Sequence, residues 1–172
     1  KTINLILNNN SNVLEQITGE NLNPTIEHKE LVKLAKNAMS KKVYNPYKGM
    51  ALQNYKKFIE SKNTAYECKA VKKYLYILRS YMAGINALKT GDIEPNINNL
   101  NKKFKLSIVN KLVELKKKEE KKVIALDIEA EEAIAKLRAE LELALQESKL
   151  PETPKNIEEL DKYLFKVRLK FM

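Results

Sequence analysis

One segment of the sequence combines cations and an aromatic ring at the spacing of a single helix face. Within a helix over residues 67–89, positions 69, 72, 73, 76, 79 and 80 share that face, because steps of three and four residues return to the same side. The face presents Lys69, Lys72, Lys73, Tyr76 and Arg79. Lysine supplies a point charge and arginine a forked pair of donors, which suits a chain of phosphates. The segment therefore indicates a phosphate-binding face; the alternative is an amphipathic helix with a basic outer face.

Other patterns that would indicate catalysis or metal binding are missing. Glycine occurs four times, at 19, 49, 84 and 91, which is too dispersed for a glycine-rich phosphate loop. Cys68 and His28 are each alone and lie forty residues apart, which argues against a cysteine nucleophile and a structural zinc site. Glu129 and Glu132 have helical spacing, but no histidine accompanies them to complete a metal site. Surface solubility explains these acids best.

The composition is that of a globular chain with a basic excess. Its 172 residues are 44% hydrophobic and 31% charged, with five Pro, and carry a net charge of +10. The net charge is +5 over residues 1–66, +8 over 67–122 and −3 over 123–172. A positive surface attracts polyanions, so nucleic acid or nucleotide phosphate is the expected partner class. The alternative is AT-rich coding, which enriches Lys and Asn without any functional pressure.

The elements that position these residues read as helices, and the predicted fold class is all-α, a multi-helix bundle. Apolar spacing places the most central helix at 67–89. We expect Ser11 to cap a helix over 12–17, Pro46 to occupy the first position of a helix reaching 61, and Asn156 to cap the last helix. Only the N-terminus could instead form a strand. The remaining predicted helices cover 26–40, 96–100, 106–122 and 124–147, with a linker at 150–154.

Four blocks in fixed order carry a resemblance to a known family. They are residues 10–15, 47–55, 72–79 and 94–100, which read NSNVLE, YKGMALQNY, KKYLYILR and EPNINNL. The blocks resemble the C-terminal half of predicted nucleotidyltransferases of the DNA polymerase beta superfamily, of the kind found in bacterial RNA-repair operons and in phages. Ser11 stands where the family usually has proline, and Tyr47 stands where a His-Tyr pair is commoner. The resemblance spans about residues 3 to 125.

The resemblance implies a helical domain behind a catalytic sheet. Family members carry Gly-Ser and Asp-x-Asp motifs whose carboxylates hold Mg²⁺ for phosphoryl transfer. This sequence has neither motif, and its only aspartates are Asp92, Asp127 and Asp161. We therefore expect a chain that lacks the catalytic half and is inactive alone, while the intact enzyme transfers a nucleotidyl group from an NTP to an RNA end or another hydroxyl. The chain starts at Lys1 without an initiator Met, which also suggests a fragment.

By analogy with the superfamily, the helical domain lends cations and an aromatic ring to the nucleotide. The resemblance thus implies nucleotide or RNA contacts for Lys72, Lys73, Tyr76 and Arg79. Lys48 and Asn54 are weaker candidates. Glu15 is expected to cap or buttress a helix, with a role beside the metals as the alternative.

The expected organisation is one helical region, 1–125, followed by a long helix, a Pro linker and a terminal helix over 126–172. This last part would pack within the chain or form a homodimer contact. A rival interpretation is a non-enzymatic basic helical module that binds nucleic acid or a protein partner. A single cysteine and the lack of any apolar run of about 20 residues favour a cytoplasmic protein with no membrane contact, in the host cytoplasm if it is phage-encoded.

Overall fold

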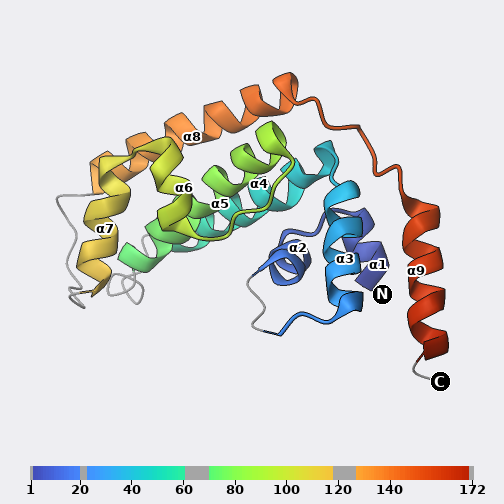
Figure 1. Ribbon diagram of the computed structural model, residues 1–172. Coiled ribbons are helices and arrows are strands. Elements are labelled where there is room, and N and C mark those ends of the chain that lie inside the picture. Colours follow the sequence, from blue (N-terminus) through green and yellow to red (C-terminus); the bar gives the residue numbers. More distant parts are fainter. Residues whose placement is uncertain (1, 20–22, 61–69, 118–126, 171–172) are drawn as a thin grey trace.

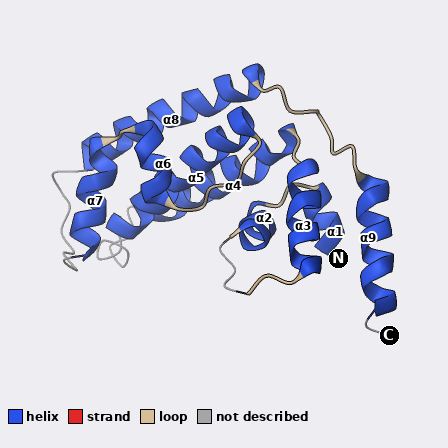
Figure 2. Cartoon of the chain, in the orientation of Figure 1, coloured by secondary structure: helices blue, strands red, loops and turns tan. Residues whose placement is uncertain are grey.

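The computed structural model describes residues 2–19, 23–60, 70–117 and 127–170, and all regular structure in these ranges is helical. Figure 2 shows helices joined by loops, so the all-α prediction is confirmed. The N-terminus forms a helix, and the alternative of a strand there is wrong. In chain order the elements are α1 Thr2–Leu7, α2 Ser11–Thr18, α3 Ile26–Asn37, η1 Lys41–Val43, α4 Tyr44–Tyr55, η2 Lys56–Glu60, α5 Ala70–Thr90, α6 Ile97–Phe104, α7 Ser107–Lys117, α8 Asp127–Glu147 and α9 Ile157–Lys170.

Helix α5 lies at the centre of the larger part of the molecule. It packs against α4, α6, α7 and α8, while α1, α2, α3 and α9 gather at one end, where both termini also lie (Figure 1). From Ile77 to Leu88 almost every side chain of α5 is buried, which is the pattern of a helix covered on several sides. The prediction of a central helix is therefore confirmed for residues 70–89, while positions 67–69 of the predicted helix lie outside the described residues.

Two predicted helix starts are shifted. Helix α2 is capped by Asn10, whose side chain accepts a hydrogen bond from the Val13 amide at 3.1 Å, and Ser11 is the first helical residue. Helix α4 begins at Tyr44, so Pro46 is its third residue and not its first. Proline is tolerated there because the first four amides of a helix have no partner within the helix. Both corrections leave the order of the helices unchanged.

Residues of the predicted appendage pack within the chain. Helix α8 buries Ala130, Ile134, Leu137, Leu141 and Ala144 in the same core as α5. Helix α9 lies against α1 and α3 and buries Leu160. Its contacts with α3 include polar ones: the Tyr163 hydroxyl donates to the Glu27 carbonyl at 3.1 Å, and Lys166 pairs with Glu30 at 2.8 Å. In the described residues, no helix is long and apolar enough to cross a membrane.

The linker before α9 is anchored rather than loose. The amide of Lys41 donates to the carbonyl of Pro151 at 2.8 Å, and the Lys41 ammonium pairs with Glu152 at 2.7 Å. The Asn156 side chain does not cap α9. Instead its amide donates to the Leu34 carbonyl at 2.9 Å, while its carbonyl oxygen is buried without a hydrogen-bond partner among the described residues. Asn156 therefore ties the start of α9 to α3.

Gly84 in α5 lies in close contact with residues of α4 and α8. A Cβ atom added there would lie 2.9 Å from Tyr47 Cβ and 3.0 Å from Leu141 Cδ1, both closer than ordinary van der Waals contact. We expect Gly84→Ala to lower the free energy of unfolding by about 1 kcal/mol, because overpacking costs about 1–3 kcal/mol and outweighs a gain of about 1 kcal/mol in helix propensity. Urea denaturation followed by helical circular dichroism measures the change.

The matched control is Gly49→Ala in α4, where an added Cβ meets nothing within 4 Å. This substitution should be neutral or stabilising, since only the propensity gain remains. Equal effects of the two substitutions would contradict the close approach at Gly84.

Candidate functional site

A cavity of about 360 Å³ lies where α5, α6 and α7 meet. Its lining holds cations and apolar side chains but no carboxylate. Three of the lining residues belong to the face that the sequence singles out on α5, namely Lys72, Tyr76 and Arg79. The others are Leu75 from α5, Ile97 and Asn98 from α6, and Val113, Lys116 and Lys117 from α7.

The cations surround an exposed ring. Tyr76 is 40% exposed, and Lys72 Nζ lies 5.8 Å from the centroid of its ring, within the range of a cation–π contact. Lys117 pairs with Glu114 at 2.9 Å, but both side chains are largely exposed, so this ion pair is weak and exchangeable. No described carboxylate pairs with Lys72 or Lys116. The cavity therefore offers positive charge together with an aromatic face.

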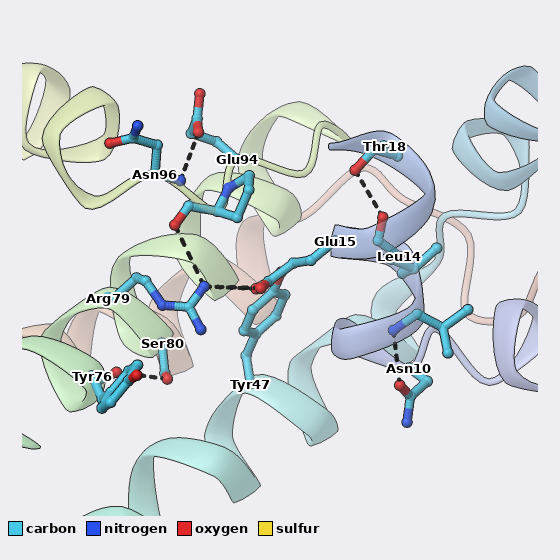
Figure 3. A network of polar contacts seen from close by, with 12 residues as sticks. Asn10, Leu14, Glu15, Thr18, Tyr47, Tyr76, Arg79, Ser80, Glu94 and Asn96 are labelled. Carbon is cyan, nitrogen blue, oxygen red and sulfur yellow. Dashed lines mark hydrogen bonds and ion pairs between the residues drawn. The ribbon is translucent and has the colours of Figure 1, made fainter. Parts of the chain in front are cut away.

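Arg79 lies at the back of this cavity in a network that joins three helices. Its Nη1 donates to both oxygens of Glu15 in α2, at 3.0 and 2.9 Å, and to the Pro95 carbonyl at 3.4 Å. Figure 3 shows the guanidinium and the carboxylate facing each other across α5 and α2, with Tyr47 rising from α4 between them. The side chains of Arg79 and Glu15 are only 18% and 15% exposed. Arg79 thus serves the structure as well as the cavity.

Tyr47 completes the network from a fully buried position. Its hydroxyl donates to Glu15 Oε1 at 3.1 Å, and the residue is 0% exposed. Burial, followed by the nearby Glu15 charge, raises the pKa of the Tyr47 hydroxyl. The hydroxyl therefore stays protonated and keeps donating to the carboxylate. This arrangement gives Glu15 the buttressing position that the sequence suggests.

Of the remaining predicted residues, those that the structure describes do not line this cavity. Lys73 lies near the Tyr76 ring, with Nζ 5.9 Å from its centroid, but it does not line the cavity, and its Nζ is 3.6 Å from the ring centroid of Phe58 in η2. Asn54 donates to the Met50 carbonyl one turn earlier in α4, at 2.8 Å. Lys69 lies outside the described residues. The cavity thus brings together Lys72, Tyr76 and Arg79 but not the full predicted set.

Lys48 belongs to a separate polar cluster between α4 and α8. It donates to the Tyr44 hydroxyl at 2.5 Å and pairs with Glu142 at 2.9 Å, while Tyr44 donates to Glu142 at 2.5 Å. The hydrogen bond from Tyr44, followed by the one from Lys48, lowers the pKa of the Glu142 carboxyl. These contacts hold α8 against α4 and place Lys48 away from the α5/α6/α7 cavity.

Sequence reasoning missed the contributions of α6 and α7. Lys116 and Lys117 begin a run of charges that is most simply interpreted as a solvated face, and Asn98 lies in a short predicted turn. One signal could have indicated these lysines: they directly follow an apolar stripe, and that stripe places one side of the helix against the core. Nothing in the sequence indicates that this side faces α5.

The described residues provide no ligand set for the Mg²⁺ that the resemblance implies. Within residues 2–19, 23–60, 70–117 and 127–170, no three residues of the types His, Cys, Asp or Glu cluster closely enough to hold a metal ion. The site that these residues form is suited to anions and not to cations.

A family model described as RlaP, RNA repair pathway DNA polymerase beta family, matches residues 1–166. The match includes α8 and most of α9 and so extends beyond the four sequence blocks. No curated protein and no solved structure matches the chain.

Proposed function

Because the chain belongs to the RNA repair pathway DNA polymerase beta family, we propose that it is the nucleotide-binding helical part of a nucleotidyltransferase. The reaction would transfer a nucleotidyl group from an NTP to an RNA end or another hydroxyl acceptor. The observation that carries the proposal is the α5/α6/α7 cavity, whose lining combines Lys72, Arg79, Lys116 and Lys117 with the exposed ring of Tyr76 and contains no carboxylate.

In this proposal the two sides of the cavity have separate tasks. Lys72 on α5 and the lysine pair on α7 supply the positive charge that a chain of phosphates requires. Tyr76 offers a ring face on which a base can stack, an interaction worth about 1–3 kcal/mol per base. Arg79 is paired with Glu15 through one nitrogen, which offsets much of its charge, so in this proposal Arg79 lines the cavity and Lys72, Lys116 and Lys117 provide the charge for phosphate.

In this proposal, the described residues do not bind the catalytic metal. Neither Gly-Ser nor Asp-x-Asp occurs in the 172 residues, and the described part holds no metal cluster. Mg²⁺, where bound, would polarise the reacting phosphate and activate the acceptor hydroxyl. We propose that carboxylates other than those described hold it, and that this chain binds and orients the nucleotide.

Binding of ATP to the full chain tests the proposal. We expect Lys72→Ala and Lys116→Ala each to weaken ATP binding about tenfold, because each removes one charge-assisted contact, worth about 1.5–3 kcal/mol. Isothermal titration calorimetry measures the affinity. The logarithm of the affinity should fall linearly with the logarithm of the salt concentration, as for other phosphate contacts made by lysines.

Lys111→Ala is the matched control, since Lys111 is also on α7 but pairs with Glu129 and does not line the cavity. It should leave ATP affinity unchanged. If all three alanine variants bind ATP like the unaltered chain, the cavity is not the nucleotide site. Tight binding of a short RNA that ATP does not displace would instead favour a nucleic-acid-binding module.

A further inference from the structure

A second cavity, of about 430 Å³, opens on the other side of α5, between α4 and α8. Its floor includes Tyr81 from α5 and Ile134 from α8, and Leu52 and Tyr55 from α4 form one wall. Tyr81 lies five residues after Tyr76, which at 100° per residue places the two rings on nearly opposite faces of α5. This cavity is therefore distinct from the one that carries the proposed function.

The floor of this cavity presents a tyrosine hydroxyl that has no partner among the described residues. Tyr81 is 1% exposed, and no described residue forms a hydrogen bond with its hydroxyl. Burial raises the pKa of the Tyr81 hydroxyl, while the nearby charges of Arg138 and Lys48 act in the opposite direction. The hydroxyl is thus a protonated donor beside positive charge. Because Tyr81 lines the cavity, its hydroxyl can donate to an acceptor on a ligand bound there.

Two charges of opposite sign line the rim on α8. Arg138 and Glu131 both line the cavity, and neither has an ion-pair or hydrogen-bond partner among the residues that the structure describes. They are seven residues apart on one helix, a separation of about 10 Å along its axis. Ala135 lies between them on α8 and its small side chain leaves the rim open. A complementary ligand needs an anion at one end and hydrogen-bond donors at the other.

The other charged residue that lines this cavity, Glu142, already has partners within the protein. Glu142 accepts from Tyr44 and pairs with Lys48, so the positive charge of Lys48 is neutralised inside the cluster. Arg138 is the cation beside Tyr81 and forms no ion pair with a described residue, although its charge also acts on Glu142; Glu131 is the acceptor at the far end. The walls between them are apolar or aromatic, which suits a flat ring.

From this arrangement we propose that the α4/α5/α8 cavity is a binding site for a nucleoside monophosphate unit whose base carries an amino group. The phosphate meets Arg138 and the Tyr81 hydroxyl, the ring lies along the wall that contains Leu52, and the amino edge of the base donates to Glu131. Its volume falls in the range of about 300–1,000 Å³ that is usual for small-molecule sites. A free mononucleotide and the terminal nucleotide of a strand share this chemistry.

The test measures binding of GMP, AMP and UMP to the full chain by calorimetry. We expect GMP and AMP to bind and Arg138→Ala to weaken both at least about tenfold, as the loss of a hydrogen bond to a charged group does. Tyr81→Phe should weaken binding several-fold without changing the unfolding midpoint, since the hydroxyl has no partner inside the protein. Glu131→Gln should reduce the preference for GMP and AMP over UMP.

Lys136→Ala, an exposed neighbour on α8 that does not line the cavity, is the control and should leave binding unchanged. A short RNA with a 5′-hydroxyl and a 3′-terminal guanosine separates the two sources of the ligand: binding tighter than that of GMP identifies a strand end, and weaker binding a free mononucleotide. The proposal is overturned if none of the monophosphates binds at millimolar concentration, or if Lys72→Ala abolishes their binding while Arg138→Ala does not.

Discussion

Replacing Arg79 with alanine is expected to lower the free energy of unfolding by about 3 kcal/mol. The substitution removes the cation from a partly buried pair and leaves the Glu15 carboxylate with only the Tyr47 hydroxyl as a hydrogen-bond donor among the described contacts. Breaking a buried ion pair from one side costs about 3–5 kcal/mol, and the residual exposure of both side chains places this pair at the lower end. Urea denaturation followed by helical circular dichroism is the appropriate measurement, because the chain contains no Trp.

Replacing the unpaired Glu15 carboxylate of Arg79→Ala with a neutral amide separates the effect of the charge from the loss of packing. We expect the double variant Arg79→Ala, Glu15→Gln to be more stable than Arg79→Ala alone, since a neutral amide is less costly to bury than an unpaired charge. Arg138→Ala serves as the control for the loss of an exposed arginine and should change stability by no more than about 0.5 kcal/mol. Equal losses at Arg79 and Arg138, without rescue by Glu15→Gln, would contradict the structural role of the pair.

Asn9→Ala is expected to lower the free energy of unfolding by about 3 kcal/mol, because the buried Asn9 side chain forms hydrogen bonds with several backbone groups. Its amide nitrogen donates to the carbonyls of Ile6 and Ala38, at 3.0 and 2.8 Å. Its oxygen accepts from the amide and the hydroxyl of Ser40, at 2.8 and 2.7 Å. Each buried group left without a partner costs about 1–3 kcal/mol. The same denaturation experiment measures the loss.

The backbone conformation of Asn9 adds to the stability loss of Asn9→Ala, and a second substitution separates the two contributions. Asn9 has φ of 49°, a left-handed conformation that asparagine tolerates better than alanine. Asn9→Gly removes the side chain but suits this conformation, so it should recover about 1 kcal/mol relative to Asn9→Ala. The exposed neighbour Asn8 provides the control, and Asn8→Ala should be close to neutral. Comparable losses at positions 8 and 9 would show that the hydrogen bonds of Asn9 contribute little.

Much of the fold and part of the site could be predicted from the sequence. Apolar residues of α5 recur at three and four residues, and this local pattern identifies both the central helix and the polar face with Lys72, Tyr76 and Arg79. The proposed buttressing position of Glu15 is also seen, although the sequence does not identify Arg79 as its partner. These features are predictable because they depend on residues within one or two helical turns.

Features that depend on tertiary contacts could not be predicted in this way. Lys116 joins Lys72 only because α7 packs beside α5, and their separation of 44 residues leaves no periodic signal. Gly84 resembles any glycine in a helix until Tyr47 and Leu141 are placed against it. The role of Asn9 likewise depends on Ser40, which is distant in sequence. In each case the second partner comes from another helix.

The polar attachment of α9 has a consequence for how the molecule opens. Helix α9 buries Leu160 and is held to α3 by exposed ion pairs, including Lys170 with Glu27, whereas α8 shares the main core. Segments with few buried apolar contacts unfold locally at a lower free energy than the whole domain. Salt weakens exposed pairs further by screening. We therefore expect the amides of α9 to exchange with solvent as a separate cooperative unit, ahead of those of α5 and α8.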